Sequence, residues 1–268
     1  LLVSDYNNNR VLIWNTIPVA NATPADNVIG QPGFRTSLSG VSAKQLNKPL
    51  GLSFTPEGRL LVTSTASHHV SVFDSVPASS YEAAVLIIGK DAFSHADPGT
   101  SDSTLNFPAE ARALPYNQLA IADTRNNRVL FFNKTPTVNG AHADAVLGQA
   151  DFFTGTAFYP SGNPDNKNMS LAYGIAGDLY GRLFVAGAGM HRVMVFGHLP
   201  EKFADLSVTI ESSASSLCSL SNIVCKINIY NAGPDTAYNV VSSAAFPAYF
   251  ILENNSAAKR IYNSKSGY

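Results

Sequence analysis

The sequence predicts an all-β protein, made of repeated four-stranded antiparallel units and followed by a smaller β-domain. Three observations lead to this prediction: a short turn motif recurs at a regular spacing, residues that favour strands flank each copy, and the pattern stops near residue 200. The chain has 268 residues, which is enough for a sizeable core and two domains. Its 19 glycines and 15 prolines are typical of a turn-rich β protein.

The clearest copy of the turn motif is Asp-Thr-Arg-Asn-Asn-Arg-Val at residues 123–129. Asn-Asn tolerates positive φ and therefore favours a tight hairpin between the flanking strands. Asp123 ends one strand and Arg128 opens the next, so we expect them to face each other across the turn as an exposed pair worth about 0–1 kcal/mol. Turn chemistry alone explains such a motif without any binding role.

Several landmarks recur in one register. The turn arginine and its equivalents are spaced by 59, 59 and 64 residues, and they are Arg10, His69, Arg128 and Arg192. A proline after the second strand of the hairpin keeps the same steps, at Pro18, Pro77, Pro136 and Pro200. A Gly-x-x-x-Phe segment recurs at 30–34, 89–93 and 148–152. A fixed period of this kind indicates stacked supersecondary units.

Each complete repeat holds four strand candidates. They are 50–55, 59–64, 69–74 and 84–89 in the second copy, and 109–114, 118–123, 128–133 and 143–148 in the third. Four antiparallel strands per repeat is the pattern of a β-propeller blade. The first copy lacks its first strand and the fourth lacks its last, so we expect a partial propeller, an open arc with further blades upstream.

The repeats resemble NHL repeats, especially a bacterial form with long blades. The resemblance rests on Asp-x-x-Asn-Asn-Arg-Val at 5–11 and 123–129, on Val-Leu-Ile-Trp-Asn-Thr-Ile-Pro at 11–18, and on Ala-Asp-Asn-Val-Ile-Gly-Gln-Pro-Gly-Phe at 25–34. It covers about residues 1–200 and implies three to four NHL-type blades in this domain. Such a fold hosts many activities, so the resemblance does not fix a function.

The pattern changes after Pro200. Residues 204–210 and 223–230 alternate as strands, and Asn-Ala-Gly-Pro-Asp-Thr-Ala-Tyr-Asn-Val follows at 231–240. This region resembles the small Ig-like β-sandwich modules of bacterial surface and secreted proteins. We therefore expect a second domain at 201–268, an Ig-like sandwich that is truncated or degenerate, in a protein located outside the cell or on its surface. In that setting Cys218 and Cys225, the two cysteines of the chain, are expected to form a disulfide.

Composition excludes some function classes. The 18 basic and 19 acidic residues leave no excess charge for binding nucleic acid, and no apolar run is long enough for membrane insertion. The six histidines show no local zinc spacing, and no catalytic serine elbow or phosphate loop is present. An axial metal would need several ligands near the first strands, but the equivalent positions are Gly51, Glu110 and Gly174. We therefore expect no cofactor, no metal site and no catalytic residue.

Two functions remain. The first is an extracellular or cell-surface binding or scaffold protein whose propeller loop face binds a protein or a glycan. The alternative is a lyase- or hydrolase-type propeller enzyme with part of its active site in missing blades. An RNA-binding role, known for some NHL proteins, disagrees with the charge balance.

Connections in a four-stranded meander alternate between two faces, so the motif turns share one face with the long loops between repeats, at 31–45, 90–104 and 149–168. Long loops on a rigid scaffold collect binding groups, although these loops would also suit a mere capping role. Tyr81 and His142 are expected on the opposite face. The candidate binding residues are Arg10, His69, His95, Arg128, Tyr159 and Arg192. Recurring aromatics are expected to pack between blades or in the core: Phe34, Phe93 and Phe152 in the loops, and Trp14, Phe73, Phe132 and Phe196 on the third strand.

Overall fold

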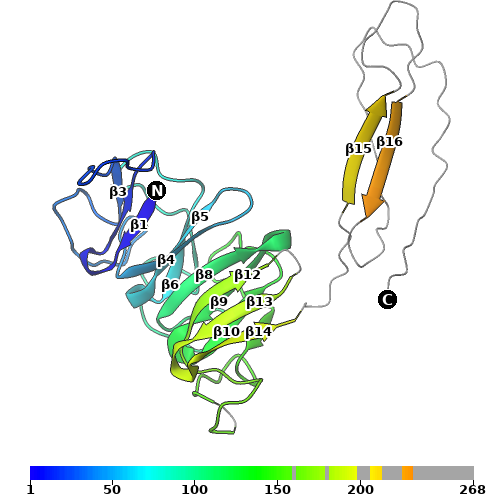
Figure 1. The fold of residues 1–268 in the computed structure, drawn as a ribbon. Helices are drawn as coiled ribbons and strands as arrows, with labels where there is room; N and C mark the ends of the chain where they lie inside the picture. The colour runs from blue at the N-terminus through cyan, green and yellow to red at the C-terminus, as the bar shows by residue number, and fades with distance from the viewer. Residues whose placement is uncertain (159–160, 179–180, 198–205, 213–224, 232–268) are drawn as a thin grey trace, which may run out of the picture. The chain divides into compact units, whose positions relative to one another are not determined.

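The computed structural model describes residues 1–158, 161–178, 181–197, 206–212 and 225–231. Its regular elements in this part of the chain are β-strands and short 3-10 turns, so the all-β prediction is confirmed (Figure 1). The chain divides into two compact parts, Leu1–Leu199 and Pro200–Tyr268, and each is described by itself. No helix among the described residues is both long and apolar enough to cross a bilayer.

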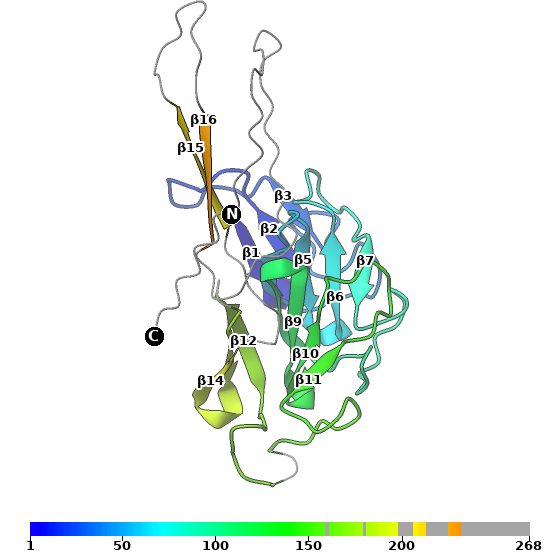
Figure 2. The same cartoon turned by 90° about the vertical axis from the view of Figure 1, so that its right-hand side faces the viewer.

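The N-terminal part contains four antiparallel sheets, each with its strands in chain order. They are sheet 1, with β1 (Leu2–Asp5), β2 (Arg10–Ile13) and β3 (Asn27–Ile29); sheet 2, with β4 (Pro49–Phe54), β5 (Leu60–Ser64), β6 (His69–Phe73) and β7 (Leu86–Ile88); sheet 3, with β8 (Pro108–Leu114), β9 (Gln118–Asp123), β10 (Arg128–Phe132) and β11 (Ala145–Leu147); and sheet 4, with β12 (Ala172–Gly177), β13 (Leu183–Gly187) and β14 (Arg192–Phe196). The eight strands predicted for the second and third repeats are all present. Figure 2 labels β5, β6 and β7 of sheet 2 and β9, β10 and β11 of sheet 3. That these sheets are the blades of a partial, open β-propeller is a finer statement and stays a prediction.

The two described segments of the C-terminal part form an antiparallel pair, β15 (Leu206–Ser212) and β16 (Cys225–Asn231). Their register sets Val208 opposite Ile229, as expected for two alternating strands. The predicted third strand and Cys218 lie outside the described residues, so the Ig-like fold and the Cys218–Cys225 disulfide stay predictions.

The hairpin turn of each repeat is a single 3-10 turn closed by a residue in the left-handed region. Asn9 and Asn127 hold this position in the first and third repeats, with φ of 54° and 52°. His68 and His191 hold it in the second and fourth, with φ of 57° and 51°. Asparagine tolerates this region well because its short side chain can bond locally, so the predicted turn chemistry is confirmed.

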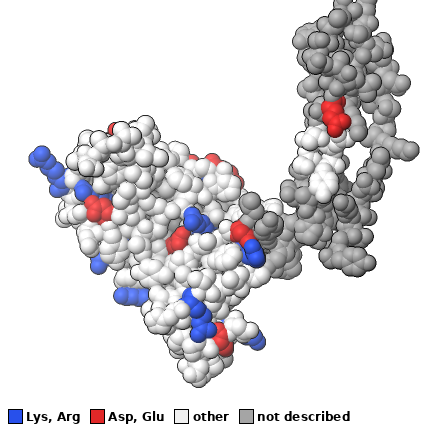
Figure 3. All heavy atoms as spheres, viewed as in Figure 1, with Lys and Arg blue, Asp and Glu red and all other residues white. Residues whose placement is uncertain are grey.

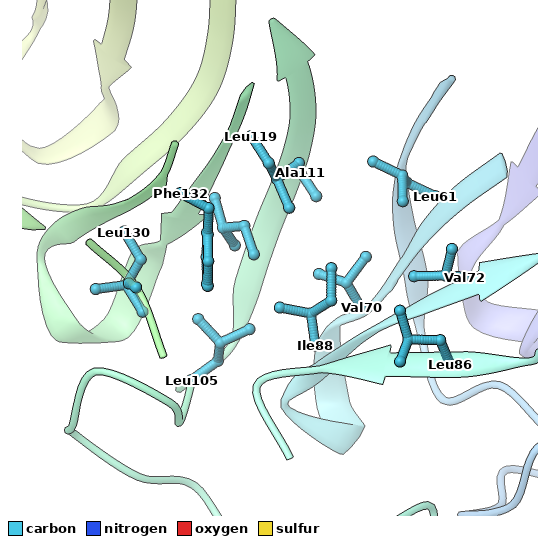
Figure 4. Close-up of a cluster of buried hydrophobic side chains, with 12 residues drawn as sticks. Leu61, Val70, Val72, Leu86, Ile88, Leu105, Ala111, Leu119, Leu130 and Phe132 are labelled. Atoms are coloured by element: carbon cyan, nitrogen blue, oxygen red, sulfur yellow. The ribbon is translucent and has the colours of Figure 1, made fainter. Parts of the chain in front are cut away.

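The sheets stack face to face, and apolar side chains fill each interface. We call the face of a sheet that packs on the next sheet along the chain its forward face, and the other its backward face. Between sheets 2 and 3, Val70 and Val72 on the forward face belong to one buried cluster with Ile121 and Phe132 on the backward face. Figure 4 shows this cluster, with Val70, Val72 and Phe132 labelled. Similar clusters join sheet 1 to sheet 2 and sheet 3 to sheet 4. Burial of these residues supplies most of the driving force for stacking.

The first strands of neighbouring sheets lie side by side, β1 beside β4, β4 beside β8 and β8 beside β12. Hydroxyl groups link neighbouring sheets here: Ser53 Oγ in β4 donates to Ala111 O in β8 at 2.5 Å, and Thr124 Oγ1 in the turn of sheet 3 donates to Ala172 O in β12 at 2.7 Å. A Cβ at Gly51 would sit 2.8 Å from the Ala109 carbonyl oxygen, so glycine permits this close approach. The starts of the first strands are thereby held together at one end of the stack.

The last strand of a sheet is covered by the loop that precedes the last strand of the following sheet. The Tyr81 amide donates to Val28 O in β3 at 2.9 Å, and the Ile87 amide in β7 donates to Asn139 Oδ1 at 3.0 Å. The Gly140 amide likewise donates to Lys90 O at 2.7 Å. These contacts protect strand edges that would otherwise be open to pairing with other chains.

This covering corrects the expected position of Tyr81 and His142. Nδ1 of His142 lies 2.8 Å from Asp102 Oδ2, and the ammonium of Lys44 lies 5.3 Å from the centre of the Tyr81 ring. Both partners belong to the long loops between repeats, so the expected placement on the opposite face is wrong. The last strands have only three residues, and the loop before each turns back along the preceding sheet.

The recurring aromatics are only partly as predicted. Phe73 and Phe132 are buried, whereas Trp14 and Phe196 are half-buried. Phe93 and Phe152 pack against the clusters between sheets, but Phe34 is exposed. Aromatic side chains at equivalent positions of the repeats are therefore not equally buried.

Candidate functional site

The 3-10 turns and the long loops between repeats lie together, and we call this surface the loop face. The Gln31 side chain donates to Asn9 O at 3.0 Å, and its equivalent Gln149 donates to Asn127 O at 3.1 Å. The Asn9 side chain donates to Ser37 O at 2.9 Å, and that of Asn127 donates to Gly155 O at 2.7 Å. The pairing of turns with loops follows the alternation expected for a meander.

The side chain that closes each of the first three turns also holds the start of the next sheet. Asn9 Oδ1 accepts from the Lys48 amide at 2.9 Å, His68 Nδ1 from the Phe107 amide at 3.0 Å, and Asn127 Oδ1 from the Leu171 amide at 2.9 Å. Each contact joins one repeat to the next at an equivalent position. We refer to these three contacts as the latches.

The three residues whose amides donate the latch hydrogen bonds have strained backbones. Lys48, Phe107 and Leu171 have φ of 53°, 51° and 49°, although none is glycine or asparagine. A non-glycine residue held in this region costs about 1–3 kcal/mol and persists only where its surroundings fix it. Each directly precedes a first strand, so the three lie at the end of the stack where those strands begin. Strain of this kind is often associated with a functional site.

The side chains at these three positions differ in chemistry. Lys48 is exposed, with its ammonium 5.7 Å from the centre of the Tyr6 ring. The Arg125 guanidinium covers the Phe107 ring at 3.4 Å, and His68 meets the same ring edge-on. Leu171 is exposed. One backbone arrangement thus presents three different side chains. Lys48 offers a cation, Phe107 an aromatic ring covered by a guanidinium, and Leu171 an aliphatic group.

Two of the predicted binding residues are buried. Arg128 donates through Nε to Asp123 Oδ2 at 2.7 Å, and both side chains are 0 % exposed, so the expectation of an exposed pair is wrong. Its other nitrogens donate to backbone carbonyls of the long loops, those of Phe152, Ser101 and Thr104. His69 is also fully buried. Neither side chain can touch a ligand on the loop face; Arg128 is a structural link between the turn and the loops.

The other predicted binding residues do not form a common site. Arg10 pairs with Asp5 at 2.8 Å and also donates to Phe34 O. His95 is exposed, with Nδ1 2.6 Å from Asp91 Oδ1, and Arg192 is exposed, with Nε 3.4 Å from Met190 O. Tyr159 lies outside the described residues. Within the described part, none of these residues is bonded to another.

The second repeat carries a different buried arrangement at the position of the Asp–Arg pair. Ser64 replaces the aspartate and keeps one of its bonds, because Ser64 Oγ accepts from the Asn47 amide at 2.9 Å as Asp123 Oδ1 accepts from the Asn106 amide at 2.6 Å. His69 replaces the arginine, and its Nδ1 is buried without a hydrogen-bond partner. Lys90 replaces Gln31 and Gln149, is buried, and donates to Asp97 O.

Burial and nearby cations keep both histidines of this repeat neutral. Burial lowers the pKa of His69 to about 4; a backbone contact with Ser67 opposes this, and the charge of Lys90 and the electrostatic coupling to His68 lower the pKa further. Burial, Lys90 and Arg125 lower the pKa of His68 to about 4, against the charge of Asp97. A neutral His68 can accept the Phe107 amide proton at Nδ1, which the latch requires.

The different burial of the two turn-motif aspartates also gives their carboxyl groups different pKa values. Burial raises the pKa of Asp123 to about 6, although the Arg128 charge and bonds from Asn106 and Asn126 oppose it. In Asp5, slight burial acts in the same direction, but bonds from Asn8 and Arg10 prevail and lower the pKa below 3.8. One sequence motif therefore holds two carboxylates with opposite pKa shifts.

Glu110 lies in β8, the first strand of sheet 3, and its side chain links this strand to the next sheet. Its Oε2 accepts from the Ile175 amide of the next sheet at 2.9 Å, and its Oε1 lies 3.6 Å from Arg112 Nε. Across the described residues, no three histidine, cysteine, aspartate or glutamate side chains gather as a metal site would require. The carboxylate therefore bonds β8 to β12.

Sequence reasoning missed Lys48, Phe107, Leu171 and Arg125. A signal was present: Leu-Asn-Lys-Pro at 46–49 and Leu-Asn-Phe-Pro at 105–108 differ at their third residue alone. A variable residue inside an otherwise repeated segment points to a position whose backbone is fixed and whose side chain is free to vary.

No family model and no curated protein matches this chain. The resemblance of residues 1–200 to NHL repeats, and that of the C-terminal part to Ig-like surface modules, therefore stay predictions drawn from motifs. The function has to be argued from the loop face itself.

Proposed function

We propose that residues 1–199 form an arc of NHL-type β-propeller blades whose loop face binds a protein or glycan partner, in a protein that acts outside the cell or on its surface. The C-terminal part is proposed to be an Ig-like module that carries this arc. The lyase or hydrolase alternative has no arrangement among the described side chains in its favour.

The observation that carries the proposal is the set of three strained positions, Lys48, Phe107 and Leu171. Equivalent latches fix their backbones, while their side chains offer charge, an aromatic ring and an aliphatic surface. Rigid presentation reduces the conformational entropy lost on binding, and mixed apolar and polar groups are what a recognition surface needs. Arg125 on the Phe107 ring adds a group that can pair with an anion or stack on a planar surface.

The distribution of surface charge does not favour a nucleic-acid partner. On the face of the molecule in Figure 3, basic and acidic side chains are scattered rather than gathered into one continuous patch of either sign. A nucleic-acid site would require a basic stripe or patch. A mixed surface suits a protein or glycan better.

The test is binding of the whole chain to a glycan array and to a library of displayed peptides. Phe107→Ala and Arg125→Ala should each weaken binding at least about tenfold, as expected for a central aromatic or arginine contact. Val19→Ala and Val138→Ala alter exposed side chains in the loops before the last strands and should have no effect. Absence of binding to either collection, or a loss caused equally by the control variants, would contradict the proposal.

A further inference from the structure

Among the described residues, the two end sheets of the stack each leave one apolar face uncovered. On sheet 4, the forward face shows Val193 at 59 % and Val195 at 55 % exposure. Their equivalents are Val129 and Phe131 in sheet 3 and Val70 and Val72 in sheet 2, none more than 2 % exposed. The apolar residues at these strand positions in sheets 2 and 3 are thus buried where a following sheet is present.

The backward face of sheet 1 is uncovered in the same way. Val3 is 40 % exposed, and its equivalents Val62, Ile121 and Val185 are all 0 % exposed. Leu12, which pairs with Val3 in the sheet, is half-buried, whereas its equivalent Leu130 is 1 % exposed. The backward faces of sheets 2, 3 and 4 all pack on a preceding sheet.

The three internal interfaces show which kind of surface covers each face. The residues equivalent to Val195 and Val3 occur together in every one of the three clusters. These pairs are Ile13 with Val62, Val72 with Ile121, and Phe131 with Val185. A forward face therefore packs on a backward face each time, and the part of the chain that the structure describes carries one free face of each kind.

We propose that the forward face of sheet 4 packs on the backward face of sheet 1 of a second copy of this chain. The contact is head-to-tail and continues the packing already present between neighbouring sheets. Such a contact forms a ring where its rotation closes. Four sheets from each of two copies make eight, and closed stacks of about four to eight blades are known. A dimer with two equivalent contacts leaves neither apolar face open to water.

The experiment measures the molar mass of the full 268-residue chain by sedimentation and light scattering over about a hundredfold range of concentration. The chain should be a dimer. Val195→Asp and Val3→Lys should each weaken association at least about a hundredfold, because each buries an unpaired charge against valine. Val19→Asp places the same charge at an exposed loop residue and should leave the dimer intact. Circular dichroism should show that every variant keeps the wild-type strand content.

Mixing the two interface variants tests the direction of the contact. An equimolar mixture of Val195→Asp and Val3→Lys chains should form the dimer that neither forms alone, since one contact then joins Asp to Lys and the other stays valine on valine. A symmetric contact between two forward faces would leave Val3→Lys dimeric by itself and would overturn the proposal. A wild-type chain that stays monomeric throughout the range would also overturn it, and would assign the two faces to another occupant.

Discussion

Nε of Arg128 lies 2.7 Å from Oδ2 of Asp123, and the structure excludes water from both side chains. The same two residue types, Arg10 and Asp5, stand 2.8 Å apart in the first repeat with both side chains partly exposed. The two pairs share one turn conformation and one local sequence pattern. They differ in what surrounds them, and the first two predictions use this difference.

Removal of the arginine should cost far more in the third repeat than in the first. Arg128→Ala leaves the Asp123 carboxylate buried and three loop carbonyls without a donor, so we expect a loss of about 3–5 kcal/mol in the free energy of unfolding. Arg10→Ala removes a partly exposed pair and should cost about 0–1 kcal/mol. Urea denaturation of both variants is the measurement. Similar costs for the two changes would contradict the burial argument.

The contributions of the two aspartates to stability should depend on pH in opposite directions. Because the folded-state pKa of Asp123, about 6, lies above its ordinary value of 3.8, its contribution to stability is full below pH 3.8 and is lost as pH rises through about 6. The contribution of Asp5, whose pKa is lowered, is present above pH 3.8 and is lost as pH falls through its folded pKa. Carbon-detected NMR titration of the two carboxyls gives the pKa values directly. In denaturation series across pH, Asp123→Asn should remove the first dependence while leaving the second.

In the second repeat, Ser64, His69 and Lys90 take the places of the Asp, Arg and Gln of the neighbouring repeats. Substitution should convert this arrangement to that of its neighbours. His69→Arg alone buries a cation without a carboxylate and should destabilise the chain by about 3 kcal/mol or more. Ser64→Asp combined with His69→Arg and Lys90→Gln recreates the Asp, Arg and Gln of the first and third repeats and should recover most of that loss. A double-mutant cycle for Ser64→Asp and His69→Arg measures their coupling. Additive effects of the two changes would show that no buried pair had formed.

Acid should weaken the latch between the second and third repeats. The folded-state pKa of His68, about 4, lies below the ordinary 6.5, so its contribution to stability is present above pH 6.5 and is lost as pH falls through about 4. His68→Asn keeps an acceptor for the Phe107 amide, as Asn9 and Asn127 provide in their repeats, and carries no titrating group. The variant should match the wild type near neutral pH and should lose less stability than the wild type between about pH 6 and 4. An unchanged pH dependence would place the effect elsewhere, His69 being the next candidate.

Local sequence determined the strands and turns of this protein. Alternation of apolar residues gave the strands of the complete repeats, and Asn-Asn gave the left-handed residue at Asn9 and Asn127, because both properties depend on neighbours a few positions away. The candidate site was harder to predict. His69 and Arg128 looked like accessible turn residues, and the strain at Phe107 was missed, because the partner of its amide is His68, 39 residues earlier in the chain.

Only the tertiary structure decided which copy of a repeated residue is buried. Val129 and Val193 follow an arginine at the same strand position, yet one is 0 % and the other 59 % exposed. Arg128 and Arg10 close the same turn, yet only Arg128 is enclosed by the carbonyls of Ser101 and Thr104 from the loop before it as well as that of Phe152 from the loop after it. Burial depends on which sheet and which loop lie against a residue, and that is a property of the stack rather than of any seven-residue motif.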